Sequence, residues 1–191
     1  VYGKASEATK TRYQRLPAAL EGVSRAPVWN LGTQSAGLYL RFRSNSTSIH
    51  ARWTSTYGSQ LSNMCPTGVR GLDLYILVDG TWRHAGVARP SNQKTTTDCM
   101  VKNMMPVERE YMLYLSLYDG VDALEIGVDE GATLSLPLAP TPRTERPVVM
   151  YGTSILQGCS ASRPGMAHTN MIARALDRDA MQLGFSGNGS L

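Results

Sequence analysis

Two short segments rich in glycine and serine carry the groups best suited to chemistry in this chain. Gly152-Thr-Ser154 follows the apolar run Val148-Val-Met-Tyr151, and Phe185-Ser-Gly-Asn188 follows Ala180-Met-Gln-Leu183. Loops that leave neighbouring parallel strands meet at one edge of a sheet, and open α/β sheets bind their ligands there. A serine hydroxyl at that edge, with backbone N–H groups beside it, suits attack on an ester carbonyl and stabilisation of the resulting oxyanion.

A turn with a helix-capping hydroxyl is the alternative interpretation of Gly152-Thr-Ser154, because serine is a common N-cap residue. A catalytic serine also needs a base, and the chain has 3 histidines. His168 lies soon after Ser154 at the start of a predicted helix, where we expect it to cap or pack rather than act as the base. His50 and His84 lie in predicted strands and are expected at the surface. The sequence therefore predicts a nucleophile without an evident base.

The elements before these segments show a strand pattern. Between residues 37 and 136, apolar and polar side chains alternate, which is the period of strands with one buried face. Asp79-Gly80 predicts a hairpin turn, and a second hairpin is expected around Asp119-Gly120, between segments 111–118 and 121–128. Closely spaced strands without a helical stretch predict that residues 1–136 form a β-sandwich, jelly-roll-like in topology.

The pattern changes after residue 136. Four prolines mark residues 137–147 as a semi-rigid linker. In residues 148–191 we expect a strand at 148–151 that is buried on both faces, a helix, and a second strand at 180–183. The helix would share one apolar face made of Met171, Ile172, Ala175 and Leu176. One β-α-β unit with two strands buries too little surface to stand alone, so we expect further polypeptide, or support from the sandwich or a partner chain.

Composition excludes several other classes of protein. The net charge of +4 is spread over scattered arginines, whereas a nucleic-acid binder more often has a basic stripe. No apolar run is long enough to span a membrane. Cys65, Cys99 and Cys159 lack metal-ligand spacing, so neither a metal nor a cofactor is expected. Whether Cys65 and Cys99 form a disulfide stays open. The first residues do not resemble a signal peptide, so either none exists or it has been removed.

Two further sets of residues have more than one interpretation. Asp73 either makes a structural hydrogen bond or faces the cleft between the two regions, and we favour the structural role. Trp29, Trp53 and Trp82 either belong to the core or form a platform on which a sugar ring stacks.

Four motifs together resemble a known family. Tyr151-Gly-Thr-Ser-Ile-Leu-Gln-Gly158 resembles the first conserved block of SGNH/GDSL hydrolases, with Thr153 in place of the usual aspartate. Leu183-Gly-Phe-Ser-Gly-Asn-Gly189 resembles their second block. Cys159-Ser-Ala-Ser-Arg-Pro-Gly-Met166 is similar to a bacterial subgroup of GDSL-like acylhydrolases whose β-rich N-terminal domain has a Gly-x-Asp-Leu-Tyr signature, present here as Gly71-Leu-Asp-Leu-Tyr75. The resemblance covers the sandwich and only the beginning of the hydrolase domain.

This resemblance implies an α/β hydrolase domain with a flavodoxin-like fold that begins at residue 148. Ser154 would be the nucleophile, the N–H groups of Ser154 and Gly187 would be oxyanion donors, and Asn188 would support the second loop. The family's asparagine block and its Asp-x-x-His block are not found in the sequence, so the chain alone is expected to be nearly inert.

The resemblance also implies a partner and a location. It points to a periplasmic or secreted enzyme that acts on a small-molecule or oligosaccharide ester, removing acetyl groups from carbohydrate, and that needs the remaining hydrolase polypeptide. The alternative function is a non-catalytic β-sandwich that binds carbohydrate or a partner protein and carries a vestigial hydrolase stub.

Overall fold

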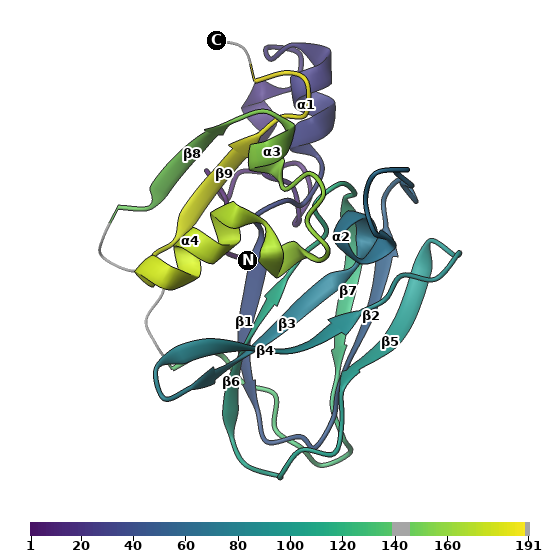
Figure 1. Cartoon of the computed structure of the whole chain (residues 1–191), viewed down its shortest axis with the longest axis vertical. Coiled ribbons are helices and arrows are strands. Elements are labelled where there is room, and N and C mark those ends of the chain that lie inside the picture. Colours follow the sequence, from purple (N-terminus) through teal and green to yellow (C-terminus); the bar gives the residue numbers. More distant parts are fainter. Residues whose placement is uncertain (139–145, 190–191) are drawn as a thin grey trace.

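Two antiparallel sheets dominate the first part of the computed structural model, which describes residues 1–138 and 146–189 (Figure 1). The first sheet has the strand order β1-β6-β3-β4, and the second has the order β5-β2-β7. The strands are β1 (Tyr39–Ser44), β2 (Ile49–Ser55), β3 (Leu72–Val78), β4 (Thr81–Ala88), β5 (Thr95–Val101), β6 (Arg109–Tyr114) and β7 (Val121–Gly127). We call residues 1–136 the two-sheet region.

Side chains from both sheets fill one core. Phe42, Leu74 and Leu113 from the first sheet pack with Ile49 and Trp53 from the second, and all five are buried. This shared core explains the alternating pattern, because each strand must turn its apolar side chains to the other sheet. The predicted antiparallel β architecture is confirmed, while the jelly-roll topology stays a prediction.

The two predicted hairpins have different outcomes. Asp79 and Gly80 both have positive φ (49° and 73°), and β3 pairs with β4 across this turn, as expected for a two-residue hairpin. The hairpin predicted around Asp119-Gly120 is wrong, because β6 and β7 belong to different sheets. Residues 115–120 are buried and cross from one sheet to the other. The Asp119 carboxylate accepts the N–H groups of Tyr57 (2.9 Å) and Ser59 (2.6 Å), which ties this crossing to a distant loop.

Short helices also occur in the two-sheet region: the 3₁₀ helix η1 (Ala18–Leu20) and α1 (Ala26–Gly32), which precede β1, and α2 (Pro66–Arg70), which lies between β2 and β3. Of these, α2 falls within residues 37–136, where no helical stretch was expected. Pro66 begins α2, where its missing N–H is no loss. Gly71 ends α2, and a Cβ there would lie 2.4 Å from the Thr67 carbonyl oxygen and 2.8 Å from that of Ala88. The first residue of the Gly71-Leu-Asp-Leu-Tyr75 signature is therefore glycine because two backbone segments approach it closely.

Residues 146–189 form a parallel β-α-β unit, which we call the C-terminal unit. Strands β8 (Val148–Gly152) and β9 (Ala180–Gly184) pair in parallel. Between them lie α3 (Ser154–Gln157), η2 (Pro164–Met166) and α4 (His168–Leu176), and α4 ends at Asp177, which has a left-handed φ of 49°. The flavodoxin-like fold and the domain boundaries stay predictions. Residues 139–145, which make up most of the predicted linker, lie outside the described residues.

Burial in the C-terminal unit contradicts two expectations. Strand β8 is not buried on both faces, since Val149 is 58% and Tyr151 45% exposed. The predicted apolar face of α4 is also largely uncovered: Met171, Ile172 and Leu176 are exposed, whereas Thr169, Asn170 and Ala173 on the opposite side are buried. An apolar pattern predicts burial only where another element covers it, and within residues 1–138 and 146–189 nothing covers these side chains.

The C-terminal unit packs against the first sheet through polar contacts at β3 (Figure 1). Asp73 is fully buried, and its Oδ2 accepts the N–H of Gly165 (2.8 Å) and lies 3.2 Å from Nε of Arg163. The Arg174 guanidinium lies 4.1 Å from the centre of the Tyr75 ring. Burial raises the pKa of the Asp73 carboxyl, and the positive charge of Arg163 opposes that shift. Asp73 thus has the structural role that we favoured, at the junction of the two regions.

None of the helices in the described part of the chain is long and apolar enough to cross a membrane.

Candidate active site

Ser154 begins α3 directly after β8, with only Thr153 between the strand and the serine. Its carbonyl oxygen accepts hydrogen bonds from the Tyr118 hydroxyl (3.1 Å) and from the N–H of Cys159 (2.8 Å). Burial raises the pKa of Tyr118 to about 12, so this hydroxyl stays protonated and able to donate at neutral pH. The hydroxyl of Ser154 has no hydrogen-bond partner among the described residues. The backbone of the predicted nucleophile is therefore anchored, while its side chain is available.

The loop after β9 lies against the loop that carries Ser154. The N–H of Phe185 donates to the carbonyl of Gly152 (2.9 Å), and a Cβ on Gly189 would lie 2.6 Å from the Gly152 carbonyl. Gly187 has a φ of +69° and open space beside its Cα. The N–H of Asn188 donates to the Phe185 carbonyl (2.8 Å), which closes a tight turn around Gly187. Two loops predicted to meet at one sheet edge do meet there.

Gln157 joins the two loops to the two-sheet region. Its side chain is fully buried, and its Oε1 accepts the N–H of Ser186 in the second loop (2.9 Å). Its Nε2 donates to the carbonyl of Leu117 (3.1 Å) and to Oε1 of Gln34. One side chain on the helix of the predicted nucleophile thus positions the second loop and fixes both to the same scaffold.

Arg15 binds the end of β9 through hydrogen bonds from its side chain. This side chain is 1% exposed, and it donates to the carbonyls of Gly184 (2.8 Å), Leu31 (2.6 Å) and Gln34 (2.9 Å) and to Oε1 of Gln182 (2.9 Å). Burial lowers the pKa of the Arg15 guanidinium to about 9, so it remains protonated at neutral pH. The carbonyl oxygens that accept its hydrogen bonds lie at the carboxyl ends of β9 and α1, and their dipoles stabilise its positive charge.

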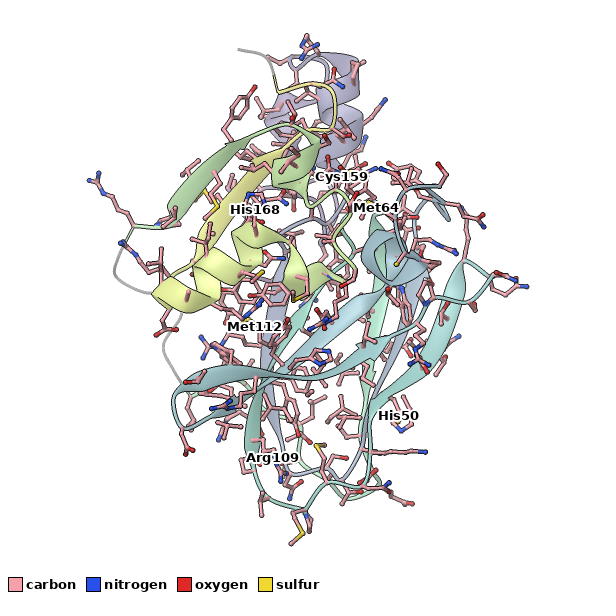
Figure 2. The ribbon with its side chains drawn as sticks, in the orientation of Figure 1. His50, Met64, Arg109, Met112, Cys159 and His168 are labelled. Carbon is pink, nitrogen blue, oxygen red and sulfur yellow. The ribbon has the colours of Figure 1, made fainter. Side chains whose placement is uncertain are left out.

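His50 and His168 lie in different parts of the molecule (Figure 2). His168 is exposed at the first position of α4, so it neither packs nor caps, since Ala167 is the N-cap residue. His50 lies in β2, on the far sheet from the C-terminal unit. His84 is at the surface as expected, but its Nε2 lies 3.2 Å from Oδ1 of the buried Asp73. None of the three forms a hydrogen bond with Ser154 within the described residues, which therefore bring no histidine base to the serine.

The structure also places the cysteines and tryptophans that the sequence left with more than one interpretation. Cys65, Cys99 and Cys159 are all free thiols, which answers the open question of a Cys65–Cys99 bridge. Trp53 is 1% exposed in the core and donates to the Arg70 carbonyl (3.0 Å), so it cannot belong to a sugar-stacking platform with Trp82 on β4. No cluster of histidine, cysteine or acidic side chains among residues 1–138 and 146–189 could hold a metal ion.

Sequence reasoning missed the residues that position the loops. Arg15 and Tyr118 lie far from Ser154 in sequence and belong to no motif, so no local signal could have found them. Gln157 is different, because it is a polar residue beside Ser154 in the Ser-Ile-Leu-Gln-Gly block, where no neighbouring residue would pair with its side chain. A polar side chain at that position could have been predicted to make a hydrogen bond to another part of the fold.

The fold and the two adjoining loops define the class: a β-rich region of two antiparallel sheets joined to a parallel β-α-β unit that carries Ser154 at the end of its first strand. Residues 1–134 match the model of the GxDLY family, described as the N-terminus of SGNH-hydrolase-type esterases, and residues 145–191 match the GDSL-like lipase/acylhydrolase family. The chain therefore belongs to the GxDLY family, and its last segment is similar to the GDSL-like lipase/acylhydrolase family.

Solved structures agree with this assignment. The chain is 41% identical, with a TM-score of 0.92, to a protein from Bacteroides ovatus ATCC 8483 assigned as a GDSL-like lipase; the match covers 98% of this chain and 54% of that one. A salicylyl-acyltransferase from a tetracycline biosynthetic pathway has 20% identity and a TM-score of 0.74, covering 99% of this chain and 52% of that one. A family two carbohydrate esterase from Clostridium thermocellum has 16% identity and a TM-score of 0.53, covering 82% and 49%.

At such low identity, the last two comparisons show similarity of fold alone. The chain spans about half the length of the solved structures that it matches. The sequence has no match among curated proteins.

Proposed function

We propose that this chain supplies the nucleophile and part of the oxyanion hole of a serine ester hydrolase. The observation that carries the proposal is the contact between the loop of Ser154 and the loop of Gly187, with the serine hydroxyl free of hydrogen-bond partners in the described part of the chain. A nucleophile needs an available hydroxyl, and an oxyanion hole needs backbone N–H groups on a rigid support. Gln157, Arg15 and Tyr118 provide that support.

The proposed reaction has two steps. The Ser154 Oγ attacks the ester carbonyl carbon and passes its proton to a histidine base, while the N–H groups of Ser154 and Gly187 stabilise the oxyanion. The carbon–oxygen bond to the alcohol breaks, the alcohol leaves with that proton, and an acyl-enzyme remains. Water then attacks the acyl-enzyme with the same base, which releases the acid and restores the serine.

The base is proposed to come from polypeptide outside residues 1–191, together with the family's asparagine donor. The uncovered apolar side chains of β8 and α4 support this, because Val149 on the strand and Met171 and Leu176 on the helix would otherwise stay in contact with water. Strand β8 also has one paired neighbour, β9, among the described strands, so its other edge can accept a further strand.

The face of the first sheet nearest the C-terminal unit favours a catalytic scaffold over a separate binding module. Its aromatic cluster contains Tyr39, Tyr75 and Tyr114, which are all buried. Arg174 covers Tyr75 and Tyr114, and the Tyr39 hydroxyl donates to Asp179. An aromatic face that is to bind sugar must be open to solvent, and this one is occupied by the C-terminal unit.

We further propose a small acyl ester of a carbohydrate as the substrate, in a periplasmic or secreted setting. Support comes from the motif resemblance and from the similarity of fold to a carbohydrate esterase. The loop around Gly187 leaves open space beside the backbone, which suits the approach of a small acyl group.

The test combines intact mass with turnover of 4-nitrophenyl acetate and of an acetylated xylo-oligosaccharide. We expect serine-dependent turnover in a protein whose mass exceeds 20.8 kDa, and a loss on the order of 10⁴- to 10⁶-fold in kcat for Ser154→Ala. Ser162→Ala is the matched control, because this exposed serine lies in the same connection and only its carbonyl makes a recorded hydrogen bond.

Two results would contradict the proposal. A mass of 20.8 kDa with full Ser154-dependent turnover would refute the claim that the base lies outside these residues. Turnover that survives Ser154→Ala would refute the nucleophile itself.

A further inference from the structure

A pocket of about 320 Å³ lies in the two-sheet region, beside the short helix α2. Its walls include the apolar side chains of Leu61, Met64 and Val69, and the polar side chains of Arg70 and Asn92. This volume lies within the range of small-molecule sites. None of the residues around the pocket belongs to the loops of Ser154 or Gly187, so the pocket is separate from the candidate active site.

Arg70 is the unusual member of this pocket. The residue is 5% exposed, and no carboxylate within residues 1–138 and 146–189 forms an ion pair with it. Its Nη2 donates to the carbonyl of Ser91 (3.2 Å), and its buried Nε has no hydrogen-bond partner in the described chain. A guanidinium has five N–H donors, so Arg70 retains donors that a ligand could engage.

The surroundings of Arg70 do not supply the missing negative charge. No acidic side chain lines the pocket. The buried carboxylate of Asp119 is engaged by the N–H groups of Tyr57 and of Ser59, a residue that lines the pocket. A buried cation without a counter-charge is costly, whereas Arg15, the other buried arginine near the junction, is fully matched by carbonyl acceptors.

We infer that this pocket binds a small organic carboxylate, whose oxygens pair with Arg70 and whose apolar body packs on Leu61, Met64 and Val69. A guanidinium presents N–H groups in a planar fork that matches the two oxygens of a carboxylate. The apolar walls require that the ligand carry a hydrophobic group beside its charge. The amide of Asn92 at the rim adds a neutral polar contact. The pocket therefore selects for a compact molecule with one charged end and one apolar end.

Benzoate is the probe, with benzamide as the neutral molecule of the same shape and inorganic phosphate as the anion without an apolar body. Isothermal titration calorimetry measures the Kd of each for the purified protein. We expect benzoate to bind at least about tenfold more tightly than benzamide, because a charge-assisted hydrogen bond is lost with the neutral amide. We expect phosphate to bind more weakly than benzoate.

Two variants test the assignment. Arg70→Met removes the charge at similar length and is expected to weaken benzoate binding by at least about tenfold. Because a core change can impair folding, Asn92→Asp is the second variant: the residue is exposed, and the new carboxylate should weaken benzoate binding by about threefold or more through like-charge repulsion. Asn103→Asp, which adds the same charge on an exposed loop between β5 and β6, is the control and should leave the Kd unchanged.

Several outcomes would overturn the inference. They are no benzoate binding at millimolar concentration, equal binding of benzoate and benzamide, and equal binding of benzoate and phosphate. Benzoate binding that is insensitive to Asn92→Asp and to a folded Arg70→Met would assign the carboxylate to another site. None of these results depends on ester hydrolysis, so a failure here leaves the proposed function standing, and the reverse also holds.

Discussion

The two-sheet region and the C-terminal unit differ in the large side chains that they bury. In the two-sheet region the fully buried side chains are mainly large and apolar, such as Leu74 and Leu113. In the C-terminal unit the fully buried side chains include Gln157, Gln182 and Thr169, whereas its apolar side chains are largely exposed. The two-sheet region is organised around its own apolar core. The C-terminal unit turns polar side chains toward the two-sheet region and several apolar side chains toward solvent.

This difference indicates two sources of stability. Burial of apolar surface contributes roughly 25 cal/mol per Å² and needs no directional contact. Hydrogen bonds contribute about 1 kcal/mol each but fix positions and leave a large penalty when one partner is removed. The two-sheet region therefore has the stability of an ordinary core, while the C-terminal unit gains precise placement of its loops against that region. A site that must hold a serine and an oxyanion hole in register benefits from the second kind of support.

Truncation in the core should have the largest effect. Leu113→Ala is expected to lower the free energy of unfolding by about 2–5 kcal/mol, because it removes buried methyl groups and leaves a cavity. Chemical denaturation followed by circular dichroism measures the change. Leu176→Ala, at a site that is 54% exposed in the C-terminal unit, is the matched control and should cost less than about 0.5 kcal/mol. Equal losses would mean that α4 has a core of its own.

Removal of Arg15 should loosen the C-terminal unit more than the two-sheet region. Arg15→Met leaves buried carbonyls at the end of β9 without a donor, so we expect a loss of about 3 kcal/mol in the free energy of unfolding. Hydrogen exchange should accelerate in β9 and in the loop after it, with little change in β6. Arg12→Met at an exposed neighbouring position is the control. Uniform acceleration in both regions would contradict the idea that Arg15 acts at the junction.

The sequence predicts the strands and helices better than it predicts the contacts that they make with distant parts of the chain. Asp79-Gly80 and Asp119-Gly120 are the same local turn signal, yet only the first forms a hairpin. At the second site the Asp119 carboxylate binds the backbone of a distant loop, a contact that no local pattern encodes. In the same way, the apolar runs of β8 and α4 specify a strand and a helix correctly but not what covers them.

The candidate site follows a similar division. The meeting of the loops of Ser154 and Gly187 could be predicted, because parallel strands bring their carboxyl ends to one edge. The polar side chain of Gln157 in the serine block was a signal of a special role, but its contacts could not be predicted, since its partners Leu117 and Gln34 are distant in sequence. Asp73 is an intermediate case. The Gly-x-Asp-Leu-Tyr signature predicts that this residue has a defined role, but its contacts with Gly165 and Arg163 are seen only in the fold.

Asp73→Asn is expected to have an intermediate effect on the junction. The amide oxygen can still accept the N–H of Gly165, but the attraction to Arg163 is lost, so we expect a decrease of about 1–2 kcal/mol in the free energy of unfolding. Limited proteolysis should cut the segment around η2 faster. Asp122→Asn is the control, because this exposed carboxylate accepts one hydrogen bond from Thr56 within the two-sheet region. Similar proteolysis of both variants would show that charge at Asp73 does not hold the regions together.

Substitution on the apolar face of α4 should cause the smallest change in stability. It also tests most directly whether the two regions differ in what covers their apolar side chains. Ile172 is 41% exposed and lies one helical turn from Leu176, so the two side chains form a continuous apolar surface. In a protein limited to residues 1–191, Ile172→Ser should alter the free energy of unfolding by less than about 0.5 kcal/mol, yet reduce binding of the dye ANS to the native protein. Val23→Ser removes an apolar side chain that is 77% exposed in the two-sheet region, outside any such face, and should leave dye binding unchanged. A large loss of stability in Ile172→Ser would mean that this face is covered in solution, which would remove the asymmetry between the two regions.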